Sequence, residues 1–185
     1  GPTDDGAETE APADDDSETE APAEDDSESD EPTEEADAAD VIEVEPGAAF
    51  LTGDVNIVCV LGPDGEETVI CDPAATAEPI DVLEEAGCDP ANQRPVIVLA
   101  EGTVTGDCWD DLVAPEADVA AGGAWVGDGL TTPLWDGMEG AVLEDGQTLR
   151  TPTHECTASG EDTVTCQDLD GEHGYTLSMS EFETW

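Results

Sequence analysis

The chain has 185 residues, of which 50 are Asp or Glu and only two, Arg94 and Arg150, are Lys or Arg, giving a formal net charge of −48. This charge excludes nucleic acid as a partner, because affinity for phosphates depends on Lys and Arg, and it disfavours anionic lipid headgroups. Metal ions and basic proteins remain as charged partners, and no apolar run approaches the 18 residues that a membrane-spanning helix needs.

Residues 1–46 form a low-complexity segment that carries 21 acidic residues and no basic one. The sequence ETEAPADDDS at 8–17 recurs as ETEAPAEDDS at 18–27, without any aromatic residue. A segment that cannot bury apolar area stays disordered, and its own charge extends it. We therefore expect a disordered spacer that holds a domain away from a cell surface. A solubilising tail and a bait for basic partners are the alternatives.

The first two residues, Gly1-Pro2, are typical of the remnant of a cleaved tag. We expect the natural chain to continue upstream into a removed signal, a lipid anchor or a single transmembrane helix. The acidity has two interpretations that the sequence leaves open. It serves either solubility in a salty medium, where screening reduces self-repulsion, or a specific function.

The pattern of residues 47–185 predicts one mostly β domain. We expect a small antiparallel sheet or sandwich with long loops and one or two short helices. The expected strands, separated by turn signals such as GPDG and ASGED, are 55–61, 67–71, 95–100, 140–144, 163–167 and 174–179. The one clear helix is expected at 81–87, with Asp81 as its N-cap and Gly87 at its end.

Six cysteines in such a domain are typical of an exported protein. In VNIVCVLGPDGEETVIC the turn places Cys59 opposite Cys71, and facing residues of antiparallel strands lie about 4.5–5.5 Å apart, a separation that a disulfide accepts. The same geometry recurs in HECTASGEDTVTC. The expected disulfides are Cys59–Cys71, Cys156–Cys166 and, by elimination, Cys88–Cys108. A zinc site is the alternative, but its usual C-x₂₋₄-C spacing is absent.

Tryptophans beside carboxylates or glycines suggest a sugar-binding surface, in which the rings cover the C–H face of a sugar and the acids accept hydroxyl hydrogen bonds. The alternative is that the rings anchor the core or the loops. The possible glycan contacts are Trp109, Trp125, Trp135, Asp110 and Asp136.

The closing stretch TVTCQDLDGEHGYTLSMSEFETW contains His173, one of two histidines. Its possible partners in a metal or acid/base site are His154, Asp168 and Asp170, although a turn histidine bonded to its own loop is the simpler interpretation. Nearby carboxylates would raise its pKa. Because an EF-hand needs Glu at position twelve, where this loop has Met179, we expect weak diffuse cation binding, no specific metal site and no cofactor.

After this loop, alternating apolar residues predict a strand that begins at Gly174. The alternation ends at Phe182, and Ser180 with Glu183 matches a capping box. We therefore expect the chain to end in one short helical turn, with Phe182 and Trp185 packing back on the domain.

The chain resembles a family of secreted or lipid-anchored actinobacterial cell-envelope proteins of unknown function. The resemblance runs from Phe50 to the C-terminus, omits 110–139, and is carried by FLTGDVNIVC, VICD, GDCWDD, VLEDGQTLRTPTHEC and, most specifically, VTCQDLDGEHGYTLS. Three positions depart from the family pattern: Asp54-Val55 replaces Gly, Asp168 replaces Asn and Tyr175 replaces Phe. The resemblance implies an envelope-exposed domain with structural disulfides and supplies no catalytic residue.

Enzyme motifs are missing, since there is no G-x-S-x-G elbow and no lysine for a P-loop. Our first hypothesis is a non-enzymatic, extracellular or cell-surface-anchored binding or scaffolding module of the bacterial cell envelope. Its partner would be an unknown envelope protein or basic protein. The second hypothesis is a glycan-binding module that uses the tryptophan–carboxylate surfaces and takes polysaccharide. The third is an envelope hydrolase that uses paired carboxylates, although so many acids form close pairs by chance.

Overall fold

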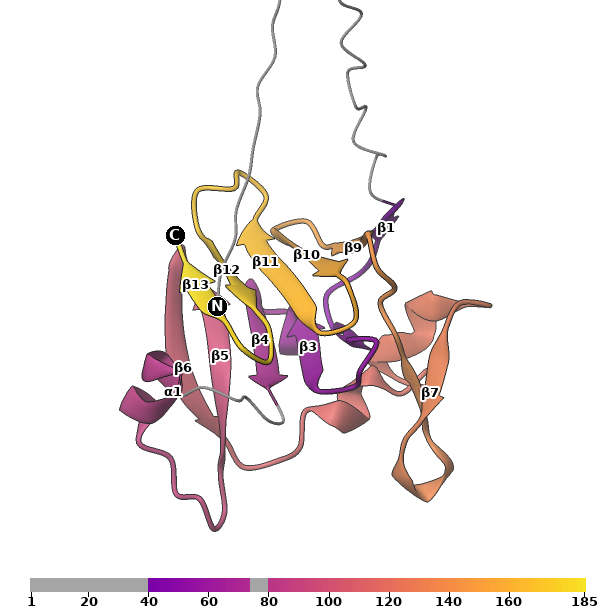
Figure 1. Cartoon of the computed structure of the whole chain (residues 1–185). Helices are drawn as coiled ribbons and strands as arrows, with labels where there is room; N and C mark the ends of the chain where they lie inside the picture. The colour runs from indigo at the N-terminus through magenta and orange to yellow at the C-terminus, as the bar shows by residue number, and fades with distance from the viewer. Residues whose placement is uncertain (1–39, 74–79) are drawn as a thin grey trace, which may run out of the picture. The chain divides into compact units, whose positions relative to one another are not determined.

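The structure, a computed structural model, describes residues 40–73 and 80–185 of the chain (Figure 1). In this part of the chain the strands form two main sheets and a small one. The six-stranded sheet contains, in spatial order, β1 (Asp40–Glu43), β9 (Gln147–Arg150), β10 (His154–Ser159), β11 (Thr163–Asp168), β12 (Gly174–Leu177) and β13 (Phe182–Thr184). The five-stranded sheet contains β2 (Ala48–Leu51), β3 (Ile57–Leu61), β4 (Thr68–Pro73), β5 (Arg94–Ala100) and β6 (Thr103–Trp109). The small sheet pairs β7 (Thr131–Pro133) with β8 (Glu139–Ala141).

Neighbouring strands are antiparallel except for the parallel pair β1 and β9. The predicted mostly β, antiparallel fold is therefore confirmed. The helical elements of the described residues are α1 (Asp81–Ala86) and the 3-10 turns η1 (Pro63–Gly65), η2 (Ala114–Ala117), η3 (Gly122–Val126) and η4 (Trp135–Gly137). None of the described helices is long and apolar enough to cross a membrane.

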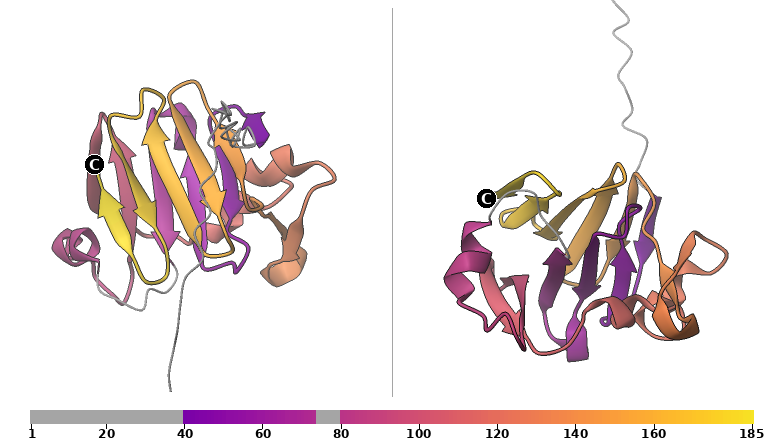
Figure 2. Two further views of the ribbon diagram at one scale, coloured as in Figure 1. Left: turned by 45° about the horizontal axis from the view of Figure 1, so that its top comes forward. Right: turned by 60° about the horizontal axis from the view of Figure 1, so that its bottom comes forward.

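The two main sheets lie face to face, as the two layers in Figure 2 show. Their facing sides form one apolar core, because alternate residues of each strand point inward. In β11, for example, Val164 and Cys166 are fully buried while Thr163 and Thr165 are partly exposed. Full burial of one large apolar side chain contributes about 1.5–3 kcal/mol. The largest of these core side chains are Phe50, Ile57, Leu61, Ile97, Leu99, Leu143, Leu149, Tyr175 and Leu177.

A second apolar layer covers the outer side of the five-stranded sheet. Val58, Val60 and Ile70 point to this side and contact Val113 and Ala117, which lie in or near η2. All five residues of β3 are consequently buried, which accounts for its uninterrupted apolar sequence. Residues 110–139, which the family resemblance omits, thus belong to the segment that covers this sheet.

The outer side of the six-stranded sheet is polar instead. Thr148, Thr157, Thr165 and Thr176 face one another on the neighbouring strands β9 to β12. Their hydroxyls form cross-strand hydrogen bonds of 2.7 Å between Thr148 and Thr157 and 3.0 Å between Thr165 and Thr176. Such pairs stabilise a sheet modestly, so this row has a sufficient structural explanation.

The disulfides are the three pairs that the sequence predicts, two from hairpin geometry and Cys88–Cys108 by elimination. Cys59–Cys71 and Cys156–Cys166 each join directly opposed residues, with Cα atoms 4.1 Å apart. Both bonds lie in the core between the sheets, and the sulfurs of Cys59, Cys71 and Cys166 are within 4.8 Å of one another. The third bond, Cys88–Cys108, joins the segment after α1 to the end of β6, near the surface.

Two local predictions are wrong. Helix α1 begins after Ile80, which is extended and offers no side-chain cap, so Asp81 occupies the first turn rather than the N-cap position. Burial of Ile80 in the core sets the start of the helix instead. Gly87 does end it, in the left-handed conformation (φ 66°), with its N–H bonded to the carbonyl of Glu84.

The expected C-terminal helical turn is a strand. Ser178, rather than Ser180, organises the turn, because its N–H donates to the Glu181 carbonyl at 2.8 Å and its hydroxyl accepts from Ser180 N–H. Strand β13 then pairs with the edge of β12, which provides more backbone hydrogen bonds than a single helical turn. Trp185 is left half exposed.

The folded part begins earlier than the boundary expected after residue 46. The segment DVIE at 40–43 forms β1 and pairs with β9 from Asp40 to Glu43. Alternate apolar residues allow this pairing, and Ile42 and Val44 pack against the core. The rest of the expected spacer lies outside the described residues. The sequence also missed β2, β6, β7, β9 and β10, which are short or carry polar side chains on one face.

Candidate functional site

The three tryptophans proposed as glycan contacts have different environments. Trp109 ends β6 and packs, partly buried, against the outer apolar layer. Trp125 lies in η3, and its indole N–H donates a 2.8 Å hydrogen bond to the carbonyl of Ala49. This bond fastens the covering segment to β2. Of the three rings, only that of Trp135 in η4 is exposed, to 43%.

The two aspartates expected beside these rings are both exposed. The carboxylate of Asp110 accepts a hydrogen bond from Gln93 at 3.1 Å. Asp136 follows Trp135 in a left-handed backbone conformation, with φ of 56°. Because Trp125 and Trp135 line separate hollows, the five residues do not form one sugar-binding surface, and only the Trp135–Asp136 pair keeps the expected arrangement.

Trp135 lines an open apolar hollow of about 280 Å³. Three exposed apolar side chains from three separate segments meet there: Val55 (42% exposed), Leu112 (44%) and Trp135. Apolar side chains that stand in water beside a hollow commonly mark a binding surface. We call this site the Trp135 hollow; its lining is Leu51, Val55, Val58, Asp72, Arg94, Leu112, Ala114, Pro133, Leu134 and Trp135.

A partly buried ion pair is the polar part of the Trp135 hollow. The Nε of Arg94 donates a 2.9 Å hydrogen bond to the carboxylate of Asp72, which is only 4% exposed. Burial raises the pKa of the Asp72 carboxyl, and the positive charge of Arg94 opposes that rise. Among the residues that the structure describes, the guanidinium makes no other hydrogen bond or ion pair. Its terminal N–H groups have no acceptor among these residues.

The backbone at the edge of this hollow is strained. Val55 has φ of 58°, a left-handed conformation that is rare for a β-branched residue and costs about 1–3 kcal/mol. The neighbouring turn maintains it, since Val55 N–H bonds to the Thr52 carbonyl at 2.8 Å and Asp54 accepts bonds from Thr52 and Asn56. The strained turn delays the start of the predicted strand 55–61, so that β3 begins at Ile57, and it keeps Val55 in solvent.

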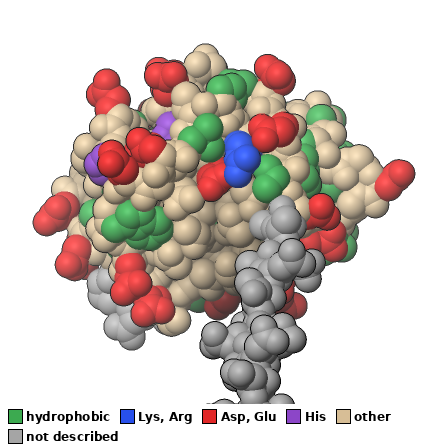
Figure 3. Space-filling model, turned by 90° about the horizontal axis from the view of Figure 1, so that it is seen from above, with side chains coloured by type: hydrophobic (Ala, Val, Ile, Leu, Met, Phe, Trp, Pro, Cys, Tyr) green, Lys and Arg blue, Asp and Glu red, His purple; other side chains and the backbone are tan. Residues whose placement is uncertain are grey.

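A second candidate site gathers both histidines of the chain around one carboxylate. His154 begins β10 and lies opposite Asp168 at the end of β11, while His173 precedes β12. The Nε2 of His154 is 3.1 Å from one oxygen of Asp168, and the Nδ1 of His173 is 3.2 Å from the other. Asp170 also contributes a carboxylate within 4.8 Å of Asp168 and His173 ligand atoms. Asp168 thus links the four residues proposed from the sequence, and Figure 3 shows histidine side chains beside acidic ones on one face of the molecule.

The two histidines of this histidine–aspartate cluster (His154, Asp168, Asp170 and His173) differ in burial. His154 is 4% exposed, and its burial lowers the pKa of the imidazole, while the charges of Asp168 and Glu67 oppose that effect. His173 is 45% exposed, and its ring lies so close to Gly102, in the β5–β6 turn, that a Cβ there would be 2.9 Å from Nδ1. The cluster therefore lies where strands of both sheets end.

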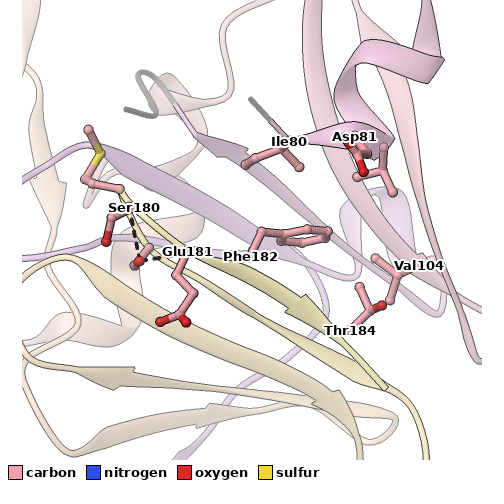
Figure 4. Close-up of a pocket in the computed structure, with 10 residues that line it drawn as sticks. Ile80, Asp81, Val104, Ser180, Glu181, Phe182 and Thr184 are labelled. Atoms are coloured by element: carbon pink, nitrogen blue, oxygen red, sulfur yellow. Dashed lines mark hydrogen bonds between the residues drawn. The ribbon is translucent and has the colours of Figure 1, made fainter. Parts of the chain in front are cut away.

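A third hollow, of about 350 Å³, lies between the edge strands β6 and β13 (Figure 4). The ring of Phe182 lies between Ile80 and Val104 in this view, and the Ser178–Glu181 turn borders the hollow. Phe182 also contacts Tyr175, with ring centroids 6.0 Å apart. Because its apolar side chains pack against the core, we interpret this hollow as the opening between two sheet edges.

Sequence reasoning missed the Trp135 hollow, although two signals were present. Leu112 is a large, exposed apolar residue in a polar, loop-rich segment. Arg94, one of only two basic residues, is a second signal. Comparison with known proteins adds no identification: no family model, no curated protein and no solved structure matches this chain.

Proposed function

We propose that this protein is a non-enzymatic binding module of the bacterial cell envelope and that the Trp135 hollow is its binding surface. The observation that carries the proposal is the meeting of three exposed apolar side chains, from separate segments, beside the partly buried Arg94–Asp72 pair. A protein maintains such exposure at a cost in solubility and, at Val55, in backbone strain. That cost is offset when a partner covers the side chains.

The partner that fits best is a basic protein that inserts an apolar side chain into the hollow. Burial of Leu112, Val55 and Trp135 by the partner would provide affinity, since aromatic and apolar anchors dominate protein interfaces. The terminal N–H groups of Arg94 would donate to a backbone carbonyl of the inserted segment. The strong negative charge of the chain would attract a basic partner over a distance and raise its association rate.

The extracytoplasmic location rests on the three disulfides. Bonds of this kind persist in oxidising compartments and are rare where glutathione keeps thiols reduced. Since all six cysteines are paired, no thiol nucleophile is available for catalysis. A module that binds without catalysis is therefore the simplest function that agrees with these features.

Site-specific photo-crosslinking in intact cells tests the proposal. A photoreactive phenylalanine analogue is placed at Leu112, and in a matched control at Leu169, another exposed leucine (45%) that lies in the β11–β12 loop. We expect a discrete basic protein to be crosslinked from position 112, not from 169, and Trp135→Ala to reduce that product at least tenfold. Equal products at both positions, or a product at 112 that is insensitive to Trp135→Ala, would contradict the proposal.

Glycan binding remains a second candidate because the exposed ring of Trp135 is followed directly by Asp136. In this case, adding isolated envelope polysaccharide changes the tryptophan fluorescence of the wild-type protein. The change disappears in Trp135→Ala and persists in Trp185→Ala, which removes a ring of similar exposure (46%). A fluorescence change that survives both substitutions would count against this candidate.

A further inference from the structure

The histidine–aspartate cluster has a feature that hydrogen bonding within the protein does not explain. The Nε2 of the buried His154 is 3.1 Å from Asp168 Oδ1, an ion-pair distance, but its direction does not give a well-aligned hydrogen bond with this or any other described residue. An unpartnered polar atom inside a protein costs about 1–3 kcal/mol. A cation that contacts both the nitrogen and the carboxylate would remove this cost.

The other nitrogen of His154 explains the orientation of the ring. Its Nδ1 is 2.9 Å from the hydroxyl of Thr153. When Nδ1 donates this bond, the neutral ring presents the lone pair of Nε2 to the oxygen of Asp168. Two electron-rich atoms then face each other, and a cation between them removes the repulsion. Histidine ligands of metals commonly show this arrangement, with one nitrogen on the ion and the other held by a hydrogen bond.

We propose that His154, Asp168, Asp170 and His173 form a binding site for a divalent transition-metal ion of the zinc class. Asp168, Asp170 and His173 place their ligand atoms within 4.8 Å of one another, and the Nε2 of His154 approaches the other oxygen of Asp168. Imidazole nitrogens and carboxylates are ligands that zinc accepts. Two ligands of one tetrahedral zinc, each about 2.0–2.1 Å from the ion, lie about 3.3 Å apart. The Nδ1 of His173 is 3.2 Å from Asp168 Oδ2 and the Nε2 of His154 is 3.1 Å from the other oxygen, Oδ1, so a carboxylate that binds through both oxygens would bring both nitrogens to one ion.

The imidazole nitrogens of this site favour an ion of the zinc class over calcium and magnesium. Calcium takes six to eight oxygen ligands, and magnesium also prefers oxygen, whereas imidazole favours zinc, copper, nickel and iron. The dense negative charge around the site raises the local concentration of any cation. Selection of the zinc class therefore comes from the two histidines, the only ones in the chain.

Metal binding would join the ends of three strands. His154 starts β10, Asp168 ends β11, and His173 precedes β12 and packs on Gly102 of the opposite sheet. The ion would therefore hold the loop 169–173 in place and stabilise the folded state, because it binds the native arrangement and not the unfolded chain. None of its ligands lines the Trp135 hollow. Loss of zinc binding would therefore leave the proposed binding surface unchanged, and loss of partner binding would leave the metal site unchanged.

Calorimetric titration of the full chain with zinc chloride tests the site. The protein carries no histidine tag and is first stripped with EDTA, and about 10 mM MgCl₂ is present to occupy diffusely binding carboxylates, which take hard cations. We expect one saturable zinc site per chain and a rise in melting temperature on zinc addition. We also expect the imidazole ¹⁵N resonances of both histidines to shift on zinc binding.

Variants then assign the ligands. His173→Ala removes a half-exposed side chain and should fold normally; it is expected to weaken zinc binding at least tenfold, as are Asp168→Asn and His154→Gln. The control replaces Glu84 and Glu85, two exposed acids of α1, by Gln and leaves zinc affinity unchanged. Absence of a saturable site under excess magnesium, or equal affinity in His173→Ala and the control, overturns the proposal.

Discussion

Tyr175 is the only tyrosine of the chain and one of the largest fully buried side chains. Its hydroxyl has no hydrogen-bond partner among the described residues. Burial therefore raises the pKa of the Tyr175 phenol far above its usual value of 10.0, because the phenolate would lie in an apolar environment without a donor. Ionisation of the Tyr175 phenol therefore reports whether the core is intact.

We predict that Tyr175 does not ionise while the protein is folded. The unfolded chain loses the phenol proton near pH 10 and the folded state retains it, so the contribution of this group to stability is complete below pH 10 and is lost as the pH rises above that value. Phenolate absorbance should therefore appear only together with unfolding, measured by circular dichroism in the same samples. Tyr175→Phe should remove this loss between pH 10 and pH 12. Phenolate absorbance near pH 10 in a folded sample would contradict the prediction.

At the scale of secondary-structure elements, helix α1 packs directly on β6. A Cβ atom at Gly106 would lie 1.9 Å from the carbonyl oxygen of Val82 and 2.7 Å from its carbonyl carbon. Both atoms belong to the helix backbone, so no side-chain rotation relieves the clash. The glycine allows the helix to approach the sheet closely, and the Cys88–Cys108 disulfide joins the same two regions of the chain.

We predict that Gly106→Ala destabilises the domain by about 2–4 kcal/mol, because α1 has to move away from the sheet. The matched control is Gly53→Ala, where the nearest atom to the new Cβ would be 3.4 Å away and no left-handed conformation is required. This control should change the free energy of unfolding, measured in urea, by less than about 1 kcal/mol. Similar losses in the two variants would show that α1 does not pack as closely as described.

At the scale of the whole molecule, two disulfides lie in the core and one lies near the surface. Their loops also differ in length, with 12 residues of separation for Cys59–Cys71 and 20 for Cys88–Cys108. Chain entropy alone makes the longer loop the more stabilising, by about 0.5 kcal/mol. Burial favours the opposite order, because removing the sulfurs of Cys59 and Cys71 leaves a cavity between the sheets.

We predict that burial decides this order. Replacing both Cys59 and Cys71 by Ala should lower the free energy of unfolding by about 4–6 kcal/mol, and replacing both Cys88 and Cys108 by about 3 kcal/mol. Denaturant unfolding of the two double variants, in the same buffer and without reductant, gives the comparison. A larger loss for the Cys88–Cys108 pair would mean that loop entropy outweighs core packing in this domain.

Part of this protein follows directly from the order of its residues. The hairpins that bring Cys59 to Cys71 and Cys156 to Cys166 depend on a turn and two short flanking strands, so neighbouring residues suffice to predict them. With these two pairs known, the third follows by elimination. The alternation of β11 and the mostly β fold are likewise local properties. Among the site residues, Asp168, Asp170 and His173 could be grouped because one loop carries them.

The rest depends on contacts between residues far apart in the chain. Strand β1 is too short and acidic to be predicted as a strand, and it forms because β9 offers it an edge about 100 residues later. The last residues pair with β12 instead of forming a helical turn because an open sheet edge is available. The Trp135 hollow exists only where Val55, Leu112 and Trp135 meet.

The sequence by itself determined the β character, the acidic composition and the hairpin disulfides, because each depends on composition or on residues close together. Only the tertiary structure decided which face of the five-stranded sheet residues 110–139 would cover. It also exposed Trp135 while burying part of Trp109. The physical reason is that burial and long-range packing act on the whole folded chain, so no short segment contains the information that fixes them.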